Sequence, residues 1–313
     1  MRESNGVHHL RSTCRVCGGS RFERFLELGP TPLANSFLRS PDEFAGERAY
    51  PLDVYFCGDC SLVQLLDVID PEVLFRDYIY LTGVSETIGE HQDRCVRTVV
   101  EMLDLGPRDL VVEVASNDGG LLSRFRDLGV RALGVEPASN IAEIARERGV
   151  DTVNEFFTSH VAARLCDEYG PARCVLANNV LAHVDDPIDF LAGCRVMLGR
   201  GGVVAFEVPY LAELVERLEY DTIYHEHLCY FSVASLARLC SEAGLSIVRL
   251  DRLSVHGGSL RVYCARSEDA PGHAADALLA IEKERGAGLC GLARYEQFAR
   301  DVMQNRRALR ETL

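Results

Sequence analysis

The segment Leu110–Gly120, which reads L-V-V-E-V-A-S-N-D-G-G, decides the fold of this chain. Its first half is a short run of branched apolar residues, which is typical of a buried β-strand. Its second half consists of small and turn-forming residues, and a helical pattern follows over residues 120–128. The segment therefore predicts a strand, a tight turn and a helix, the first unit of an α/β sheet.

The pattern continues toward the C-terminus as an alternation of strands and helices. Because helices separate most of the strands, we expect a parallel sheet with helices on both faces. The loop between the last two strands is too short for a helical crossover, so this final pair should be antiparallel. The expected strands are 110–115, 132–136, 174–178, 203–208, 246–251 and 260–265, with a weaker one at 151–154; the expected helices are 92–104, 120–128, 139–148, 187–198 and 233–243.

Four of the twelve cysteines form two C-x-x-C pairs, Cys14/Cys17 and Cys57/Cys60. Each pair can hold a zinc ion from a tight turn, and two pairs complete a tetrahedral site with four sulfur ligands. The 39 residues between Cys17 and Cys57 exceed the spacing of a compact zinc ribbon, so an insertion must lie between the pairs. Four protein ligands leave no open position, and we therefore expect structural Zn²⁺.

Composition limits the partners. The 313 residues are 47% hydrophobic and 26% charged, the balance of a soluble globular protein. The formal net charge is −14, and an acidic surface repels nucleic acid and anionic membranes. We expect no nucleic-acid or membrane partner. We find no apolar run of membrane-spanning length and no signal-peptide pattern, so a cytoplasmic location is expected. The oligomeric state cannot be inferred.

The turn after the first strand is a candidate ligand site. In doubly wound sheets, ligands bind beyond the carboxyl ends of the strands. Glu136 ends the next strand, 19 residues after Asn117, where a carboxylate can accept hydrogen bonds from a ribose. The turn lacks the G-x-G-x-x-G pattern of nicotinamide-dependent enzymes. The turn and Glu136 therefore favour an adenosine-containing ligand, and the missing glycines disfavour a nicotinamide cofactor.

Residues 220–231, Y-D-T-I-Y-H-E-H-L-C-Y-F, combine two histidines with acids and aromatics. Imidazole titrates near neutral pH and is the usual general base, and a neighbouring carboxylate or phenol can orient it. The segment follows a strand, as does His183, so both should reach the ligand-binding edge. Residues 254–261, S-V-H-G-G-S-L-R, allow two interpretations: a cradle for an anionic group or a tight hairpin.

Six motifs in this order resemble the S-adenosylmethionine-dependent sugar C-methyltransferases, which methylate a ring carbon of TDP-linked keto-deoxysugars. They are the C-x-x-C pairs, E-V-A-S-N-D-G, F-R-D-Y-I-Y-L-T-G, N-V-L-A-H-V, D-T-I-Y-H-E-H-L-x-Y-F-S and H-G-G-S-L-R. The resemblance covers residues 14–266. It implies a class I methyltransferase Rossmann-like sheet of seven strands, the last antiparallel, with a small N-terminal zinc-binding module.

The resemblance also implies roles for particular residues. Those that would contact S-adenosylmethionine are Glu113, Ser116, Asn117, Gly119, Glu136, Asn178 and Asn179. Those that would form the reacting site are Tyr224, Glu226, His227, Tyr78 and His183. His256, Gly257, Ser259 and Arg261 would bind the substrate. Members usually continue into a second Rossmann-like lobe, which would begin about where this chain ends.

We hypothesise that His227 removes a proton from the carbon next to the ketone. Tyr224 and His183 would then stabilise the enolate oxygen, and Glu226 would orient the histidine. The resulting carbanion would attack the sulfonium methyl group. This chemistry belongs to the biosynthesis of deoxysugars, as in antibiotics.

We expect five segments: a flexible leader (1–13), the zinc-binding module (14–70), a linking segment (71–91), the methyltransferase domain (92–266) and a helical tail (267–313). Two alternatives remain open. One is a methyltransferase with a non-sugar ketone or phenol acceptor. The other is a non-catalytic binding protein built on the zinc-ribbon and Rossmann-like parts.

Overall fold

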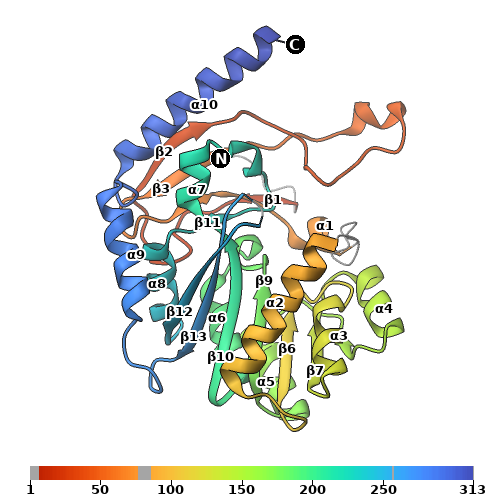
Figure 1. The fold of residues 1–313 in the computed structure, drawn as a ribbon. Helices are drawn as coiled ribbons and strands as arrows, with labels where there is room; N and C mark the ends of the chain where they lie inside the picture. The colour runs from red at the N-terminus through yellow and green to blue at the C-terminus, as the bar shows by residue number, and fades with distance from the viewer. Residues whose placement is uncertain (1–6, 77–85, 256, 313) are drawn as a thin grey trace.

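The computed structural model describes residues 7–76, 86–255 and 257–312 (Figure 1). Its largest sheet has seven strands in the order β12-β13-β10-β9-β6-β7-β8. Only β13 runs against its neighbours, being antiparallel to both β10 and β12. The strands are β6 (Leu110–Val114), β7 (Arg131–Val135), β8 (Thr152–Val153), β9 (Ala172–Asn178), β10 (Leu198–Pro209), β12 (Leu245–Leu253) and β13 (Ser259–Arg266). The predicted strands and the antiparallel last strand are confirmed.

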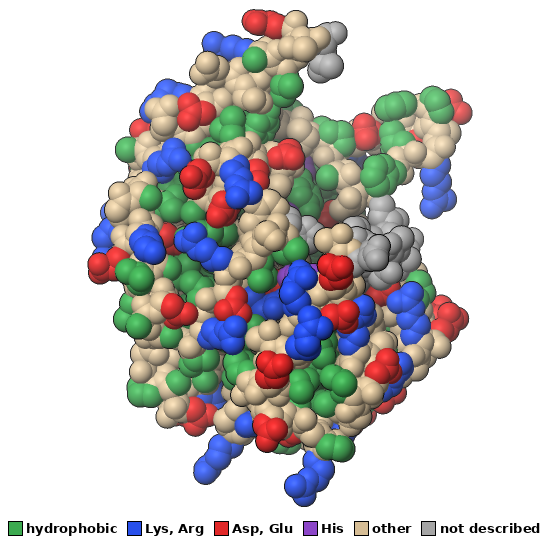
Figure 2. Space-filling model, viewed as in Figure 1, with side chains coloured by type: hydrophobic (Ala, Val, Ile, Leu, Met, Phe, Trp, Pro, Cys, Tyr) green, Lys and Arg blue, Asp and Glu red, His purple; other side chains and the backbone are tan. Residues whose placement is uncertain are grey.

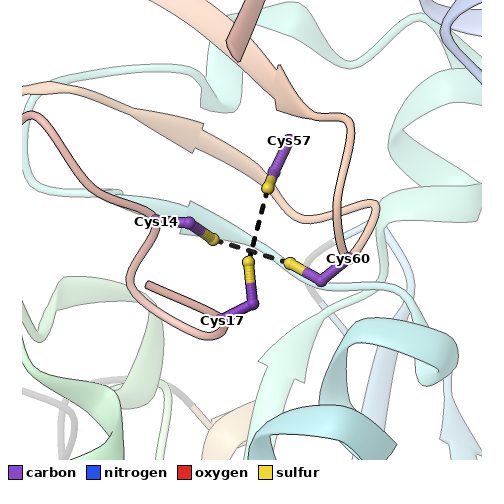
Figure 3. Close-up of side chains that lie close together, drawn as sticks. All are labelled: Cys14, Cys17, Cys57 and Cys60. Carbon is purple, nitrogen blue, oxygen red and sulfur yellow. Dashed lines mark hydrogen bonds between the residues drawn. The ribbon is translucent and has the colours of Figure 1, made fainter. Parts of the chain in front are cut away.

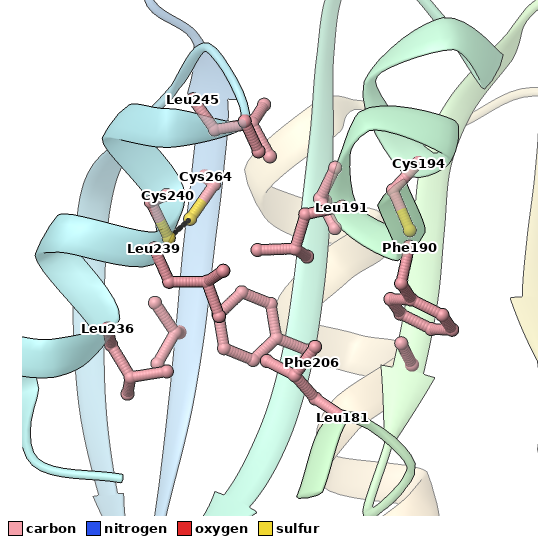
Figure 4. Close-up of a cluster of buried hydrophobic side chains, with 14 of the residues drawn as sticks. Leu181, Phe190, Leu191, Cys194, Phe206, Leu236, Leu239, Cys240, Leu245 and Cys264 are labelled. Atoms are coloured by element: carbon pink, nitrogen blue, oxygen red, sulfur yellow. Dashed lines mark hydrogen bonds between the residues drawn. The ribbon is translucent and has the colours of Figure 1, made fainter. Parts of the chain in front are cut away.

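Helices cover both faces of this sheet, because alternate strand residues point to opposite sides. Val112 and Val114 of β6 belong to a core with α5 (Ser159–Tyr169), α6 (Pro187–Met197) and α8 (Val233–Glu242). Figure 4 shows part of this core, where Phe206 of β10 lies among leucines of α6 and α8. Val111 belongs to the opposite core, with α2 (Glu86–Leu103) and α3 (Gly120–Asp127). The helix α4 (Ser139–Glu147) lies between β7 and β8 in the chain.

A second sheet lies over the carboxyl ends of the parallel strands (Figure 1). Its order is β11-β4-β3-β2, with β2 (Phe22–Glu27), β3 (Asp53–Cys57), β4 (Val63–Leu65) and β11 (Cys229–Tyr230). The strand β11 comes from the predicted catalytic segment, so that segment is hydrogen-bonded into the N-terminal module. Nearby lie the two-stranded sheet of β1 (His8–Leu10) and β5 (Asp67–Ile69), and the short α1 (Pro71–Phe75).

Helices α7 (Leu211–Arg217) and α10 (Leu292–Thr312) pack on the N-terminal sheet, and α9 (Ala275–Gly286) packs beside α8. Phe298 and Tyr295 of α10 are buried against Val54 and Phe56 of β3. The predicted helical tail therefore contacts both parts of the molecule. Among the described residues, we find no helix with the length and apolar character that crossing a bilayer requires.

Candidate active site

The four cysteines of the C-x-x-C pairs come together as predicted (Figure 3). Their Sγ atoms all lie within 4.8 Å of one another, with 3.5 Å between Cys14 and Cys60 and 3.6 Å between Cys17 and Cys57. Sulfur atoms at the corners of a tetrahedron around Zn²⁺ are about 3.8 Å apart, given the Zn–S distance of about 2.3 Å. The donor set therefore fits a structural zinc ion.

The cysteines of the cluster share protons, because the hydrogen bond that lowers the pKa of Cys14 raises the pKa of Cys60. The hydrogen bond with Cys60 lowers the pKa of Cys14 to about 4, although burial opposes this shift. The Nε2 amide of Gln64 donates to Cys14 Sγ at 3.2 Å. The expected insertion between the pairs is the segment 28–52, which connects β2 with β3 and which we call the arm.

The predicted cofactor turn has an unusual backbone. Ala115 and Asn117 have φ values of 54° and 49°, and Gly119 has 74°. Such conformations cost energy in non-glycine residues and are concentrated at functional sites. Glu136 accepts backbone hydrogen bonds from Asn117 at 2.9 Å and from Ala138 at 2.8 Å. The end of β7 thereby fixes the turn after β6.

Buried polar atoms at this edge fit a polar cofactor. Glu113 Oε2, Ser116 Oγ and Asn178 Oδ1 have no hydrogen-bond partner among the described residues. Buried polar groups are normally paired, so three such atoms at the ends of β6 and β9 indicate a ligand that supplies the partners. Burial raises the pKa of Glu113 well above its usual range, and the neighbouring carboxylates add to this shift. Asn179 follows at φ 54°, its backbone N–H bound to Glu207 O.

Tyr224 and His227 form a hydrogen-bonded pair. The Tyr224 hydroxyl lies 3.0 Å from His227 Nε2, and His227 Nδ1 lies 2.8 Å from the carbonyl oxygen of Thr222. A carbonyl only accepts, so Nδ1 carries the hydrogen and Nε2 accepts from the phenol. Burial raises the pKa of Tyr224 to about 12, which keeps its hydroxyl protonated at neutral pH.

His183 lies against this pair, its ring centroid 4.8 Å from that of His227. Burial lowers the pKa of His183 to about 3, and the neighbouring His227 acts in the same direction. His183 is thus neutral at physiological pH, and its buried Nδ1 has no hydrogen-bond partner among the residues that the structure describes. A small cavity beside His227 is lined mainly by apolar side chains, including Ala182, Leu211 and Leu214.

Glu226 differs from the expected arrangement. The Thr222 carbonyl makes the orienting contact with the imidazole that the sequence analysis assigned to Glu226. Glu226 Oε1 instead accepts from Nδ2 of Asn35 in the arm, at 2.8 Å. Sequence reasoning missed Asn35 and Thr222. A main-chain acceptor has no sequence signature, and no motif connects Asn35 with a residue 191 positions away.

The segment 254–261 forms the tight hairpin between β12 and β13. The Ser259 hydroxyl donates to Val255 O at 3.2 Å, and Gly257 O accepts from Arg217. Arg261 is buried in an ion pair with Glu207, which also accepts from His91 at 2.8 Å. Of the two interpretations, the hairpin is observed, and the anion-binding role stays a prediction. His256 and Tyr78 lie outside the described residues.

Comparison with known families divides the chain into three matches. A zinc binding domain model matches residues 14–75, a methyltransferase domain model matches 88–250, and a C-methyltransferase C-terminal domain model matches 254–313. The zinc match contains all four cysteines. The methyltransferase match covers about half of the chain and contains the turn after β6, His183 and the Tyr224–His227 pair.

Two curated relatives and two solved structures illustrate the similarity. The C-methyltransferase NovU of Streptomyces niveus is 38% identical over 300 residues, which are 95% of this chain and 71% of that protein. A ubiquinone biosynthesis O-methyltransferase of Burkholderia pseudomallei is 26% identical over 180 residues, 52% of this chain and 75% of that one.

The magnesium protoporphyrin IX methyltransferase of Synechocystis PCC 6803 with bound SAM has a TM-score of 0.44 at 14% identity, over 57% of this chain and 79% of that chain. An S-adenosylmethionine-dependent methyltransferase of Clostridium acetobutylicum has a TM-score of 0.45 at 13% identity, over 56% and 90%.

The similarity to NovU extends over 95% of the chain, and the C-methyltransferase C-terminal domain model matches residues 254–313. The cysteine cluster and the unpaired polar atoms at the sheet edge fit the two expected cofactors. The chain therefore belongs to the C-methyltransferases, enzymes that use S-adenosylmethionine and that here carry a structural zinc site in the N-terminal module.

Proposed function

We propose that this enzyme methylates the carbon next to the ketone of a TDP-linked keto-deoxysugar. The observation that carries the proposal is the Tyr224–His227 pair at the carboxyl edge of the sheet, with its proton acceptor fixed in one tautomer. A carbon next to a ketone becomes nucleophilic only after it loses a proton, so this reaction needs a positioned base. The motifs shared with sugar C-methyltransferases favour the sugar acceptor.

In this mechanism the α-carbon–hydrogen bond breaks and the proton ends on Nε2 of His227. The Thr222 carbonyl keeps Nδ1–H in place and stabilises the imidazolium that forms. As the substrate binds, the Tyr224 hydroxyl turns its hydrogen bond from His227 Nε2 to the substrate oxygen, which frees Nε2 to take the proton. The bond electrons move into the enolate, whose oxygen then accepts hydrogen bonds from the neutral groups Tyr224 and His183. Neutral donors suit this task, because the raised pKa of Tyr224 and the lowered pKa of His183 hold both in their uncharged forms.

When bound, S-adenosylmethionine supplies an electrophilic methyl group on a sulfonium. We propose that Glu113, Ser116, Asn117, Gly119 and Glu136 hold it from the β6 and β7 side, and Asn178 and Asn179 from the β9 side. The side chains with unpaired polar atoms at this edge support the assignment. The carbon–carbon bond forms as the carbon–sulfur bond breaks, so positioning is the main requirement.

The experiment is proton exchange at the α-carbon of the sugar in D₂O, measured without methyl donor. His227→Ala should abolish the exchange, and His160→Ala, an exposed histidine on α5, should leave it at the wild-type rate. Exchange that persists unchanged in His227→Ala would show that another group is the base.

A methyltransferase that acts on a non-sugar ketone or phenol remains the second candidate. Incubation with labelled methyl donor and a panel of TDP-keto-deoxysugars, small ketones and phenols separates the two by the mass of the product. Labelled methyl on oxygen would contradict the C-methylation. The non-catalytic binding protein considered from sequence is excluded, because the chain is a member of an enzyme family.

A further inference from the structure

The arm of the N-terminal module reaches the reacting residues. It leaves β2 at Leu28 and returns to β3 at Leu52, and its base is closed by backbone bonds between Thr31 and Tyr50 at 3.0 and 2.9 Å. Beyond this closure the arm projects from the body (Figures 1 and 2), and Phe44 of the arm is exposed. It is thus a separate segment whose position depends on a few contacts.

The segment Tyr224–His227 makes two of these contacts. His225 Nε2 lies 3.2 Å from Tyr50 O and 3.1 Å from Pro51 O. Both partners are carbonyl oxygens, so the nitrogen carries the hydrogen and donates. Tyr224 and His227 form the proposed reacting pair. His225, which lies between them in the chain, instead donates to the base of the arm.

The second contact is between Asn35 and Glu226. Asn35 Nδ2 donates to Glu226 Oε1 at 2.8 Å, and Glu226 is only 2% exposed. Oε2, its other oxygen, is buried and has no hydrogen-bond partner among the described residues. Among the described residues, Asn35 therefore makes the one side-chain hydrogen bond to this carboxyl group, and a group held at one oxygen has a defined orientation.

We propose that Asn35 is a positioning residue of the methyl-transfer site, which acts by fixing the Glu226 carboxyl group from the zinc-binding module. The inference rests on the proposed function, because Glu226 acts on the reacting pair: besides burial, its charge helps to raise the pKa of Tyr224. Without the amide donor, the carboxyl group would lose its fixed rotation and the partner of Oε1. An unpaired buried carboxylate is costly, so it would turn or take up a proton.

The test is a double-mutant cycle on Asn35 and Glu226. Asn35→Ala should lower kcat for the TDP-keto-deoxysugar about 10-fold, a loss typical for one charge-assisted hydrogen bond, and leave S-adenosylhomocysteine affinity within about twofold. In the background of Glu226→Ala the same change should have no further effect. The matched control is Ser36→Ala, an exposed neighbour in the arm, which should behave as wild type. Equal losses in both backgrounds would overturn the proposal.

The pH dependence of kcat/KM provides a further test, because a residue with a purely structural role would not shift it. Burial raises the pKa of Glu226 and the Asn35 hydrogen bond lowers it, so Asn35→Ala should raise it further. If ionised Glu226 is the active form, the acid limb of kcat/KM moves to higher pH in this variant. Asn35→Asp should regain activity as the pH falls, because a protonated aspartic acid again donates to Oε1. An unshifted limb in both variants would contradict the positioning role.

A second cycle on the midpoint of urea unfolding needs no acceptor. If Asn35 and Glu226 interact, the two single changes are non-additive, and additive shifts would overturn the proposal even when turnover is absent. A wrong acceptor would abolish turnover in every variant and leave this coupling intact. Failure of the proposed function and failure of the inference are therefore distinguishable.

Discussion

At the scale of single residues, burial sets the protonation states that the chemistry needs. His183 and Tyr224 are shifted in opposite directions, yet both shifts favour the neutral form, because the interior penalises charge of either sign. The Thr222 carbonyl selects the tautomer of His227. A neutral donor, a neutral phenol and a ring nitrogen in its acceptor form are what an enolisation site requires.

The shift of His183 predicts how stability depends on pH. Its pKa is about 3 in the folded protein and about 6.5 in the unfolded chain, so the unfolded chain binds more protons between these values. Stability should therefore fall as the pH drops from about 6.5 toward 3. The contribution between pH 7 and pH 5 is about 1–2 kcal/mol.

His183→Gln removes the titrating group and keeps a polar side chain of similar size. The difference in unfolding free energy between pH 7 and pH 5, measured with urea, should shrink by about this 1–2 kcal/mol relative to wild type. His160→Gln, on an exposed face, is the control and should keep the wild-type difference. Parallel stability curves for His183→Gln and wild type would contradict the assigned shift.

Sequence reasoning reached some site residues and missed others for physical reasons. Tyr224 and His227 are three positions apart, so local density revealed them. The Asn35–Glu226 bond joins residues that only the folded arm brings together. His225 matches its neighbours in chemistry, yet it donates to two main-chain carbonyls, and the sequence does not distinguish these roles.

At the scale of elements, the methyltransferase sheet was predictable because its signals are local. Each strand is an apolar run next to a helical pattern, and β6 to β10 follow the expected ranges within a few residues. The helix α5 and the strand β11 were not predicted. The two residues of β11 are strand only because Cys229 and Tyr230 pair with Gln64 and Val63, far away in the chain.

The C-terminal helices provide a prediction at this scale. Glu284 of α9 is buried and accepts from the backbone N–H groups of Val233 and Ala234 at 2.6 and 2.9 Å, and from the Tyr210 hydroxyl at 2.9 Å. It therefore satisfies the free donors at the start of α8, where the helix dipole also favours a carboxylate.

Glu284→Gln should lower the unfolding free energy by about 2–3 kcal/mol, because an amide N–H would then face a backbone N–H in a buried site. Urea denaturation measures the loss. Glu282→Gln, exposed on the same helix, serves as the control and should change the value by less than about 0.5 kcal/mol. A loss no larger than that of the control would mean that α9 contributes little to the N-terminus of α8.

At the scale of the whole molecule, the zinc-binding module contacts the segment that carries residues we propose for the reacting site. The strand β11, which follows the Tyr224–His227 pair in the chain, pairs with β4 of the module, and the arm contacts Glu226. A third link starts between the zinc ligands, where the buried Arg15 donates to Asp185 at 3.0 Å, two residues after His183. The domain boundaries expected at residues 70, 91 and 266 stay predictions, because these contacts join segments on both sides of them.

We therefore expect the loss of zinc to impair methyl transfer far more than it impairs binding of S-adenosylhomocysteine. The turn proposed to hold the cofactor is built on β6 and β7 in the seven-stranded sheet, whereas Glu226 in the proposed acceptor site is held by the zinc-binding module. Cys60→Ser should lose the metal, measured by elemental analysis, and reduce methylation by at least about 100-fold, since misplaced reacting groups cost that much. S-adenosylhomocysteine affinity should change by less than about fivefold, or under 1 kcal/mol.

Cys290→Ser, a cysteine outside the cluster, should retain zinc and activity. Full methylation by the zinc-free variant would show that the reaction does not depend on the zinc-binding module. Equal losses of S-adenosylhomocysteine binding and turnover would show that zinc stabilises the module and the seven-stranded sheet alike.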